Sequence, residues 1–128
     1  MKRQLISSGA PWEKKVGYSR ALKAGNLIFV SGTSATGEDG EVLHRGDAYG
    51  QTLLILQKIG KALQQAGASF QHVTRTRIYT TDISLWEEIG TAHASVFGEI
   101  RPATSMVEVR ALIHPDMLVE IEADAVLD

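Results

Sequence analysis

The sequence contains no cysteine. Disulfide bonds, thiolate zinc sites and a cysteine nucleophile are therefore excluded, and the absence is neutral about compartment. Long hydrophobic runs are missing too: no stretch approaches the roughly 18 apolar residues of a membrane span. The two early positive charges are followed by no apolar segment typical of a secretory signal. We therefore expect a cytoplasmic protein with no membrane partner.

Clustered positive charge is also absent. The chain has 13 Lys and Arg against 15 Asp and Glu, a formal net charge of -2, and its basic residues are scattered. Binding to a nucleic-acid backbone requires a basic patch or stripe, because affinity comes from releasing counterions from phosphates. The composition therefore predicts no nucleic-acid partner.

The four histidines, His44, His72, His93 and His114, lack the short spacing typical of metal ligands. The sequence implies neither a metal nor a cofactor. His93 falls in the apolar seam of an expected helix, where two interpretations stay open. It is either a hydrogen-bonded core histidine or a general acid or base that lines a cleft.

The 128 residues, of which 44% are hydrophobic and 22% charged, are typical of a single globular domain, here residues 1–128. Two strand-like runs flank the turn signal Gly25-Asn26 and predict a hairpin. Asp47 is a good N-cap for a helix closed by Gly67. The apolar seam of this helix contains Tyr49, Leu53, Leu56, Ile59, Leu63 and Ala66.

The second half of the chain predicts a strand over 72–81 and a second helix that begins at Ser84. The seam of that helix contains Trp86, Ile89, His93, Val96 and Phe97. Two strands, 104–112 and 117–125, follow and are joined by the turn 113–116. The predicted order is ββαβαββ, an α+β fold with both helices on one face of a mixed sheet.

The last strands show which side chains share a face, because side chains alternate along a strand. Val119, Ile121 and Ala123 form an aliphatic side that suits the helices. The same alternation places Glu120 on the opposite, charged side of this strand. We expect Met106, on the preceding strand, to lie on that charged face as well. The face is either solvated or an oligomer interface with paired charges and pockets.

Three segments occur in an order that resembles the reactive-intermediate deaminase (RidA, or YjgF-like) family, some of whose members are labelled L-PSP endoribonucleases. They are PWEKKVGYSRALKAGNLIFVSGT, RPATSMVEVRAL and VEIEADAV. The resemblance implies a chorismate-mutase-like fold and a homotrimer with small-molecule clefts at subunit boundaries. It also implies hydrolysis of reactive enamines and imines to ketoacids and ammonia.

The resemblance assigns the water-orienting glutamate to Glu120 and substrate contacts to Tyr18, Gly32 and Thr33. Glu120 has an alternative interpretation as an interface charge. The Ser-Gly-Thr run lacks the motif of a serine nucleophile, so we expect it to end a strand with backbone groups aimed at a ligand.

Three pocket positions depart from the family pattern: Thr104 replaces the arginine that clamps a substrate carboxylate, Met106 a cysteine, and Gly90 an asparagine. Threonine carries no charge, so a 2-iminoacid loses its anchor. Arg101 is either a displaced clamp or a surface arginine, since its odd offset from Thr104 turns it to the other side of a regular strand.

We therefore expect a hydrolase of the imine or enamine deaminase type that does not prefer 2-iminoacids. A non-catalytic ligand-binding or regulatory trimer is the alternative, and a ribonuclease is the third candidate.

Overall fold

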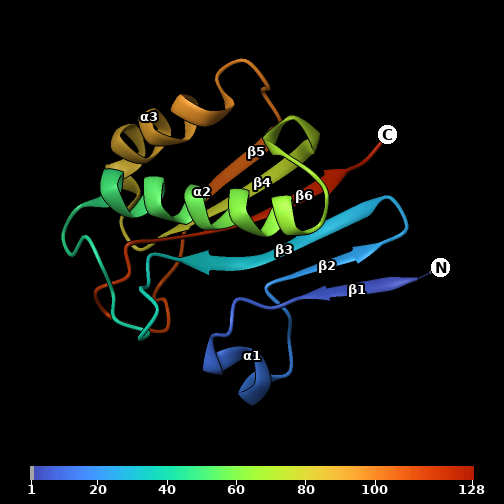
Figure 1. Ribbon diagram of the computed structural model, residues 1–128. Coiled ribbons are helices and arrows are strands. Elements are labelled where there is room, and N and C mark those ends of the chain that lie inside the picture. Colours follow the sequence, from blue (N-terminus) through green and yellow to red (C-terminus); the bar gives the residue numbers. More distant parts are fainter. Residues whose placement is uncertain (1) are drawn as a thin grey trace.

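The protein, described by a computed structural model over residues 2–128, consists of one six-stranded mixed sheet with two long helices on one face (Figure 1). The strand order is β1-β2-β3-β6-β4-β5, and every neighbouring pair is antiparallel except the parallel pair β4–β5. The elements are β1 (Arg3–Ile6), α1 (Pro11–Val16), β2 (Ala21–Ala24), β3 (Leu27–Ser34), α2 (Ala48–Gln65), η1 (Phe70–His72), β4 (Val73–Thr80), η2 (Ile83–Leu85), α3 (Trp86–Phe97), β5 (Ala103–Glu108) and β6 (Val119–Val126). The predicted α+β fold is confirmed. In the described part of the chain, no helix combines the length and the apolar character that crossing a membrane requires.

The hairpin and the first long helix form where the sequence predicts them. β2 and β3 pair across the Gly25-Asn26 turn. The Asp47 carboxylate accepts a hydrogen bond from the Gly50 amide at 2.9 Å and caps α2. Gly67 has a φ of 82°, the left-handed conformation that ends a helix.

The predicted seam of α2 is correct only in its second half. Leu56, Ile59 and Leu63 are buried, whereas Tyr49 and Leu53 are exposed, contrary to the expectation. The core side of the first turns is instead occupied by small and polar residues, namely Ala48, Gln51 and Thr52.

The start of the second long helix also differs from the prediction. Asp82, and not Ser84, is the capping residue, since its carboxylate accepts from the Ser84 amide at 3.0 Å and opens η2 ahead of α3. Trp86 is 56% exposed, so it lies outside the buried seam. Ile89 and Phe97 are buried as predicted.

Two elements near the start of the chain were not predicted. β1 has four residues and buries only Ile6, which is too short to show an alternating pattern. α1 begins at Pro11, a residue suited to a first helical turn, and ends at Gly17 with a φ of 90°. Its Glu13 is buried and accepts a hydrogen bond from the Ser8 amide at 3.1 Å.

The last two strands are joined by a turn but are not neighbours. The His114 carbonyl accepts from the Met117 amide at 3.0 Å, which confirms the turn. β6 then inserts between β3 and β4, and β5 becomes an edge strand on the far side of β4. Because β5 pairs only with β4, its register follows that strand.

This register corrects the predicted face of β5. Thr104 and Met106 pair with Thr76 and Ile78, which are buried beneath the helices. Met106 therefore lies on the helix-covered face and not on the charged face with Glu120. The alternation within β5 was right, but the sequence alone did not show which side of this edge strand meets the core.

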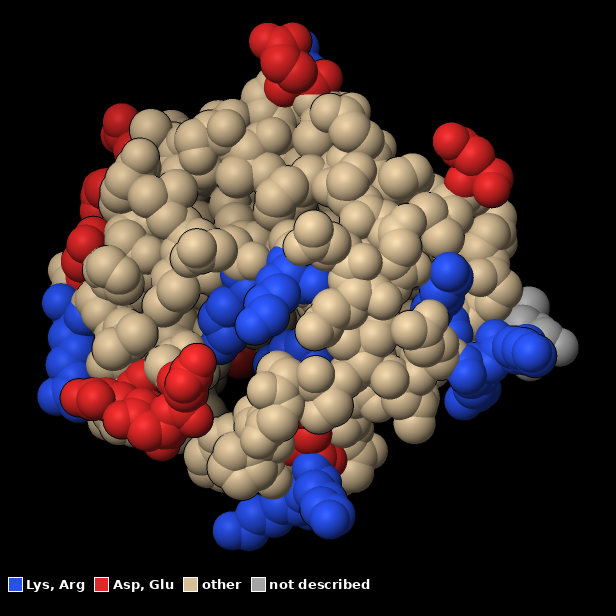
Figure 2. Space-filling model, viewed as in Figure 1, with Lys and Arg blue, Asp and Glu red and all other residues tan. Residues whose placement is uncertain are grey.

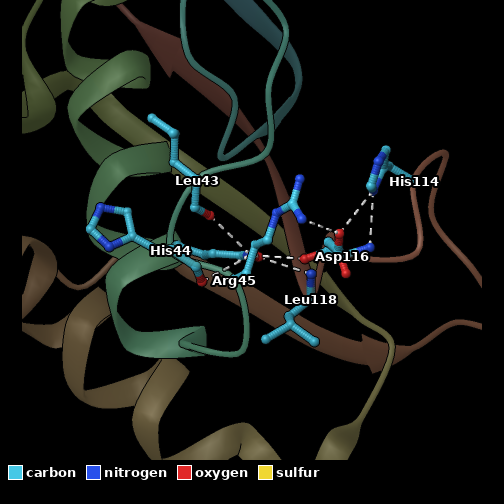
Figure 3. A network of polar contacts seen from close by, with 7 residues as sticks. Leu43, His44, Arg45, His114, Asp116 and Leu118 are labelled. Carbon is cyan, nitrogen blue, oxygen red and sulfur yellow. Dashed lines mark hydrogen bonds and ion pairs between the residues drawn. The ribbon is translucent and has the colours of Figure 1, made fainter.

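Gln51 connects α2 to two loops through Leu43, His44, Asp116 and Leu118, which lie close together in Figure 3. Its side chain is fully buried, and its Nε2 donates to the carbonyls of Leu43, His44 and Asp116 at 3.3, 3.3 and 2.9 Å. Its Oε1 accepts from the Leu118 amide at 2.9 Å. One side chain thus holds the entry to α2 and the entry to β6 in a fixed relation.

We predict that Gln51→Leu lowers the free energy of unfolding by about 3 kcal/mol, because removing the amide leaves several backbone groups without partners. Urea denaturation of the variant and the wild type measures this difference. Gln4→Leu is the control, since Gln4 is exposed and a surface change costs less than about 0.5 kcal/mol. Equal stability of Gln51→Leu and wild type would contradict the role assigned to the amide.

Candidate functional site

Glu120 stands on the sheet face opposite the long helices, next to β3. It pairs with Ser34 on one side and Tyr79 on the other. Gly32 lies directly beside it: a Cβ on residue 32 would come within 2.5 Å of the Glu120 Oε2 atom. A side chain at position 32 would therefore displace the carboxylate, and glycine gives the carboxylate its room.

Arg20 lies next to both Gly32 and Tyr18. Its Nη2 donates to the Gly32 carbonyl at 2.6 Å, and its Cζ atom lies 5.7 Å from the centre of the Tyr18 ring. Tyr18 in turn lines a pocket of about 410 Å³ that is formed with residues 5–19. The arginine is buried, and its Nε has no hydrogen-bond partner among the described residues.

Sequence reasoning missed Arg20. The available signal was an arginine directly before the buried start of β2, where a solvated residue is not expected. The structure brings it together with Tyr18, Gly32 and Glu120, which the sequence did single out.

Burial raises the pKa of the Glu120 carboxyl; Arg20 opposes this rise, and the neighbouring Glu122 adds to it. Burial also lowers the pKa of Lys58 to about 8, with the Arg20 charge acting in the same direction. The Lys58 ammonium donates to the carbonyls of Ser34 and Thr36 at 2.7 and 3.2 Å. Lys58 therefore fastens the end of β3 to α2.

The same sheet face carries paired charges beyond Glu120. Arg77 lies 3.6 Å from Glu122 and 3.2 Å from Asp124, and the Tyr79 hydroxyl donates to Glu122 at 2.8 Å. That hydrogen bond raises the pKa of Tyr79. On the face of the molecule shown in Figure 2, lysines and arginines form separate small groups and no continuous stripe.

A second polar group lies on the helix side of the sheet. The Thr76 Oγ1 atom lies 2.9 Å from His93 Nε2 and 2.7 Å from Thr104 Oγ1. His93 stacks on Phe97 with ring centres 4.7 Å apart. His93, Phe97, Arg101 and Thr104 line a pocket of about 400 Å³.

His93 is hydrogen-bonded and lies at a pocket, and its role as a general acid or base stays a prediction. The ring is half-buried and hydrogen-bonded, as a core histidine would be, and it also lines the pocket. Burial lowers its pKa from the ordinary value. Its neutral form is therefore favoured at neutral pH.

Arg101 lies beside Thr104, although the regular-strand argument turned it away. Its φ of 57° is left-handed, and its amide donates to the Phe97 carbonyl at 2.8 Å, so it closes the turn that connects the end of α3 to β5. The strand offset therefore does not apply to it. The exposed guanidinium lines the same pocket as Thr104.

The remaining expected site residues lie elsewhere. Thr33 is fully buried on the core side, and its hydroxyl donates to the Ser31 carbonyl at 2.8 Å, so its side chain does not line either pocket. Gly90 is in α3 with open space around it. Met106 packs against the core. Within residues 2–128, no three histidine, aspartate or glutamate side chains gather in a way that could hold a metal ion.

The polar group around Glu120 and the polar group around Thr104 cannot meet within one chain. Thr104 pairs with Thr76, which pairs with Ala123 on the core face of β6, whereas Glu120 faces the opposite side. The sheet lies between them. A single cleft that contains both Glu120 and Thr104 therefore needs a second copy of the chain.

Comparisons with known proteins agree on one family. Residues 10–127 match the family Endoribonuclease L-PSP. A crystal structure from Mycobacterium tuberculosis, described as a member of the highly conserved YjgF/YER057c/UK114 family, is 52% identical and has a TM-score of 0.89, with 98% of this chain and 100% of that one covered.

Two curated relatives are less similar in sequence. The 3-aminoacrylate deaminase RutC of Acinetobacter baylyi is 39% identical over 108 residues, which are 84% of this chain and 85% of the relative. A RutC family protein of Pyrococcus horikoshii is 37% identical over 127 residues and 98% of both chains. From the family match, the sequence identity and the shared fold, the chain belongs to the Endoribonuclease L-PSP family, also known as the YjgF or RidA family.

Proposed function

We propose that the chain is a hydrolase that converts small imines or enamines to carbonyl compounds and ammonia. The observation that carries the proposal is the arrangement of Glu120: a half-buried carboxylate with a raised pKa, beside a glycine that leaves it room. Such a carboxylate is a stronger base than an exposed one, as general acid–base catalysis requires. The 39% identity to a protein named 3-aminoacrylate deaminase supports the same reaction type.

The reaction needs little apparatus, since a protonated C=N bond is already electrophilic. The Glu120 carboxylate accepts a proton from water as the water oxygen bonds to the imine carbon, and then returns that proton to nitrogen. The C–N bond breaks, ammonia leaves with the electron pair, and the hydroxyl proton passes to the Glu120 carboxylate as the carbonyl forms. Arg20 keeps the Gly32 backbone, and with it the space for the carboxylate, in place.

The proposed site lies between copies of the chain in a homotrimer. The two polar groups occupy opposite faces of one sheet, so a neighbouring copy is required if Glu120 and Thr104 act on one substrate. The paired charges around Arg77 and the exposed Val107 fit a face that is covered by another subunit.

The substrate preference follows from position 104. Thr104 offers a hydroxyl and no charge, and Arg101 in the same pocket is exposed to solvent, which screens it. We therefore propose that 2-iminoacids are poor substrates at neutral pH and that imines or enamines without a carboxylate are preferred.

A ribonuclease activity, as in the family's name, is not favoured. The net charge of -2 and the separated basic groups in Figure 2 do not provide a track for a phosphate backbone. A ligand-binding trimer without catalysis remains the competing hypothesis, and turnover separates it from the hydrolase.

The first prediction concerns assembly. At micromolar concentration the protein should sediment as a trimer, because a cleft with both polar groups requires neighbouring copies. Analytical ultracentrifugation measures the mass. A stable monomer would remove the shared cleft.

The second prediction adds the missing charge. Thr104→Arg should raise kcat/KM for a 2-iminoacid roughly tenfold to a hundredfold, because a charge-assisted hydrogen bond to the carboxylate contributes about 1.5–3 kcal/mol. Thr104→Gln, which is long and polar but uncharged, is the matched control. Ammonia release in a coupled assay gives the rates. Equal activity of wild type and Thr104→Arg would show that another group already anchors the carboxylate.

The third prediction tests the space beside Glu120. Gly32→Ala should reduce kcat, because the new Cβ would overlap the carboxylate that activates water. The loss should vanish in a Glu120→Ala background, where no carboxylate remains to be displaced. A loss of the same size in both backgrounds would mean that Gly32 acts independently of Glu120.

A further inference from the structure

Arg20 is a buried cation whose charge has no anionic partner in contact with it. The residue is 8% exposed, and within residues 2–128 its guanidinium forms no salt bridge. Its Nη2 donates to the Gly32 carbonyl at 2.6 Å, and its Nε has no hydrogen-bond partner in this part of the chain. Because burying an unpaired charge costs free energy, we expect this guanidinium to act on charges beyond contact distance.

The carbonyl that Arg20 binds belongs to an irregularity in the sheet. Two residues of β3, Ser31 and Gly32, stand opposite the single residue Glu122 of β6, which is the pattern of a β-bulge. Bulges change the direction of neighbouring side chains and are common beside active sites. The hydrogen bond from Arg20 therefore fixes the conformation of the bulge that lies next to Glu120.

This bulge brings the Arg20 charge close to the Glu120 carboxylate. Gly32 contacts both groups, since its carbonyl accepts from Nη2 and a Cβ on it would lie 2.5 Å from the Glu120 Oε2 atom. With ordinary bond lengths, these two contacts place Nη2 within about 9 Å of Oε2. The two charges form no salt bridge, so they interact across the protein, where the effective dielectric constant is lower than in water.

Several titratable groups surround Glu120 and act on it in opposite directions. Burial raises the pKa of its carboxyl, Arg20 lowers that pKa, and Glu122 on the same strand raises it further. The remaining groups are held by other residues: Tyr79 by Glu122, Arg77 by Glu122 and Asp124, and Lys58 by Ser34 and Thr36. Arg20 is therefore the neighbour that favours the charged form of this carboxyl.

We propose that Arg20 is the positioning residue of Glu120, whose guanidinium keeps the carboxylate charged and ready to accept a proton while its hydrogen bond fixes the bulge beside it. The consequence for turnover rests on the proposed function, whereas the effect on the charge of Glu120 does not. Arg20 itself needs no contact with the substrate for this role.

The direction of the effect follows from the charges. Glu120 accepts a proton from water only as a carboxylate, so kcat/KM falls as the pH falls through the pKa of this group. A positive charge nearby favours the carboxylate, and removing it raises the pKa. Loss of the Arg20 charge should therefore move the acid limb of the pH profile to higher pH.

Three variants of Arg20 separate its charge from its other contributions. Arg20→Lys keeps the charge, Arg20→Gln keeps a hydrogen-bond donor without charge, and Arg20→Met keeps only part of the volume. A carbon-13 NMR titration of the Glu120 carboxyl, whose resonance is identified by its loss in Glu120→Gln, measures the pKa without any substrate. We expect the pKa to rise by about one unit in the Gln and Met variants and to stay near the wild-type value in Arg20→Lys. The same pKa in all four proteins would overturn the proposal.

The pH profile of ammonia release gives the second readout. At pH values below the acid limb, Arg20→Gln should have a kcat/KM about tenfold lower than wild type, and the difference should shrink as the pH rises. Arg20→Lys should restore the wild-type profile. A loss of equal size at every pH would indicate a purely structural role and would overturn the proposal.

A matched control and a test of folding complete the design. Arg45→Gln removes an exposed arginine that pairs with Asp116, and it should change neither the pKa of Glu120 nor the pH profile. Circular dichroism and sedimentation show whether each variant keeps the fold and assembly of the wild type. If Arg20→Met does not fold, the comparison of Arg20→Gln with Arg20→Lys still decides the question.

The two readouts distinguish this inference from the proposed function. Ammonia release together with a Glu120 pKa that ignores Arg20 would refute the positioning role and leave the hydrolase standing. A Glu120 pKa that responds to the Arg20 charge, without turnover of any imine, would support the positioning role and refute the hydrolase.

Discussion

Strand β6 occupies the middle of the sheet, between β3 and β4, and its alternation constrains the rest of the molecule. Its inward side chains, Val119 and Ile121 among them, are buried under the helices. Every residue between them must therefore face the other way, and these residues are carboxylates. The core and the candidate catalytic face are thus two sides of one strand, and a register shift of one residue would exchange them.

Placing Glu120 at the centre rather than the edge of the sheet gives it rigid neighbours. Paired strands on both sides fix its backbone, and Gly32 leaves it space. Arg20 keeps that glycine in place through a hydrogen bond to its carbonyl. The second pocket is built differently. Thr104 lies on an edge strand and depends on a buried hydroxyl and a histidine for its orientation.

Much of this could be predicted from the sequence because its signals are local. The Asp47 cap, the Gly25-Asn26 turn and the alternation in β6 all depend on neighbouring residues. Three features depended on pairing between distant segments and were missed: the strand order, the face of Met106 and the position of Arg20. For Arg101 only the strand-offset argument failed, and for a local reason, since its left-handed backbone is invisible to a strand-period argument.

The order of strands in the sheet differs from their order along the chain, and this has a consequence for how the protein is made. β3 and β4 become connected only when β6, which is made after both of them, enters between them. Until then the apolar faces of α2 and α3 have only part of their sheet to cover. Such long-range closure is slow compared with hairpin or helix formation, so nascent and truncated chains would expose apolar surface to chaperones and proteases.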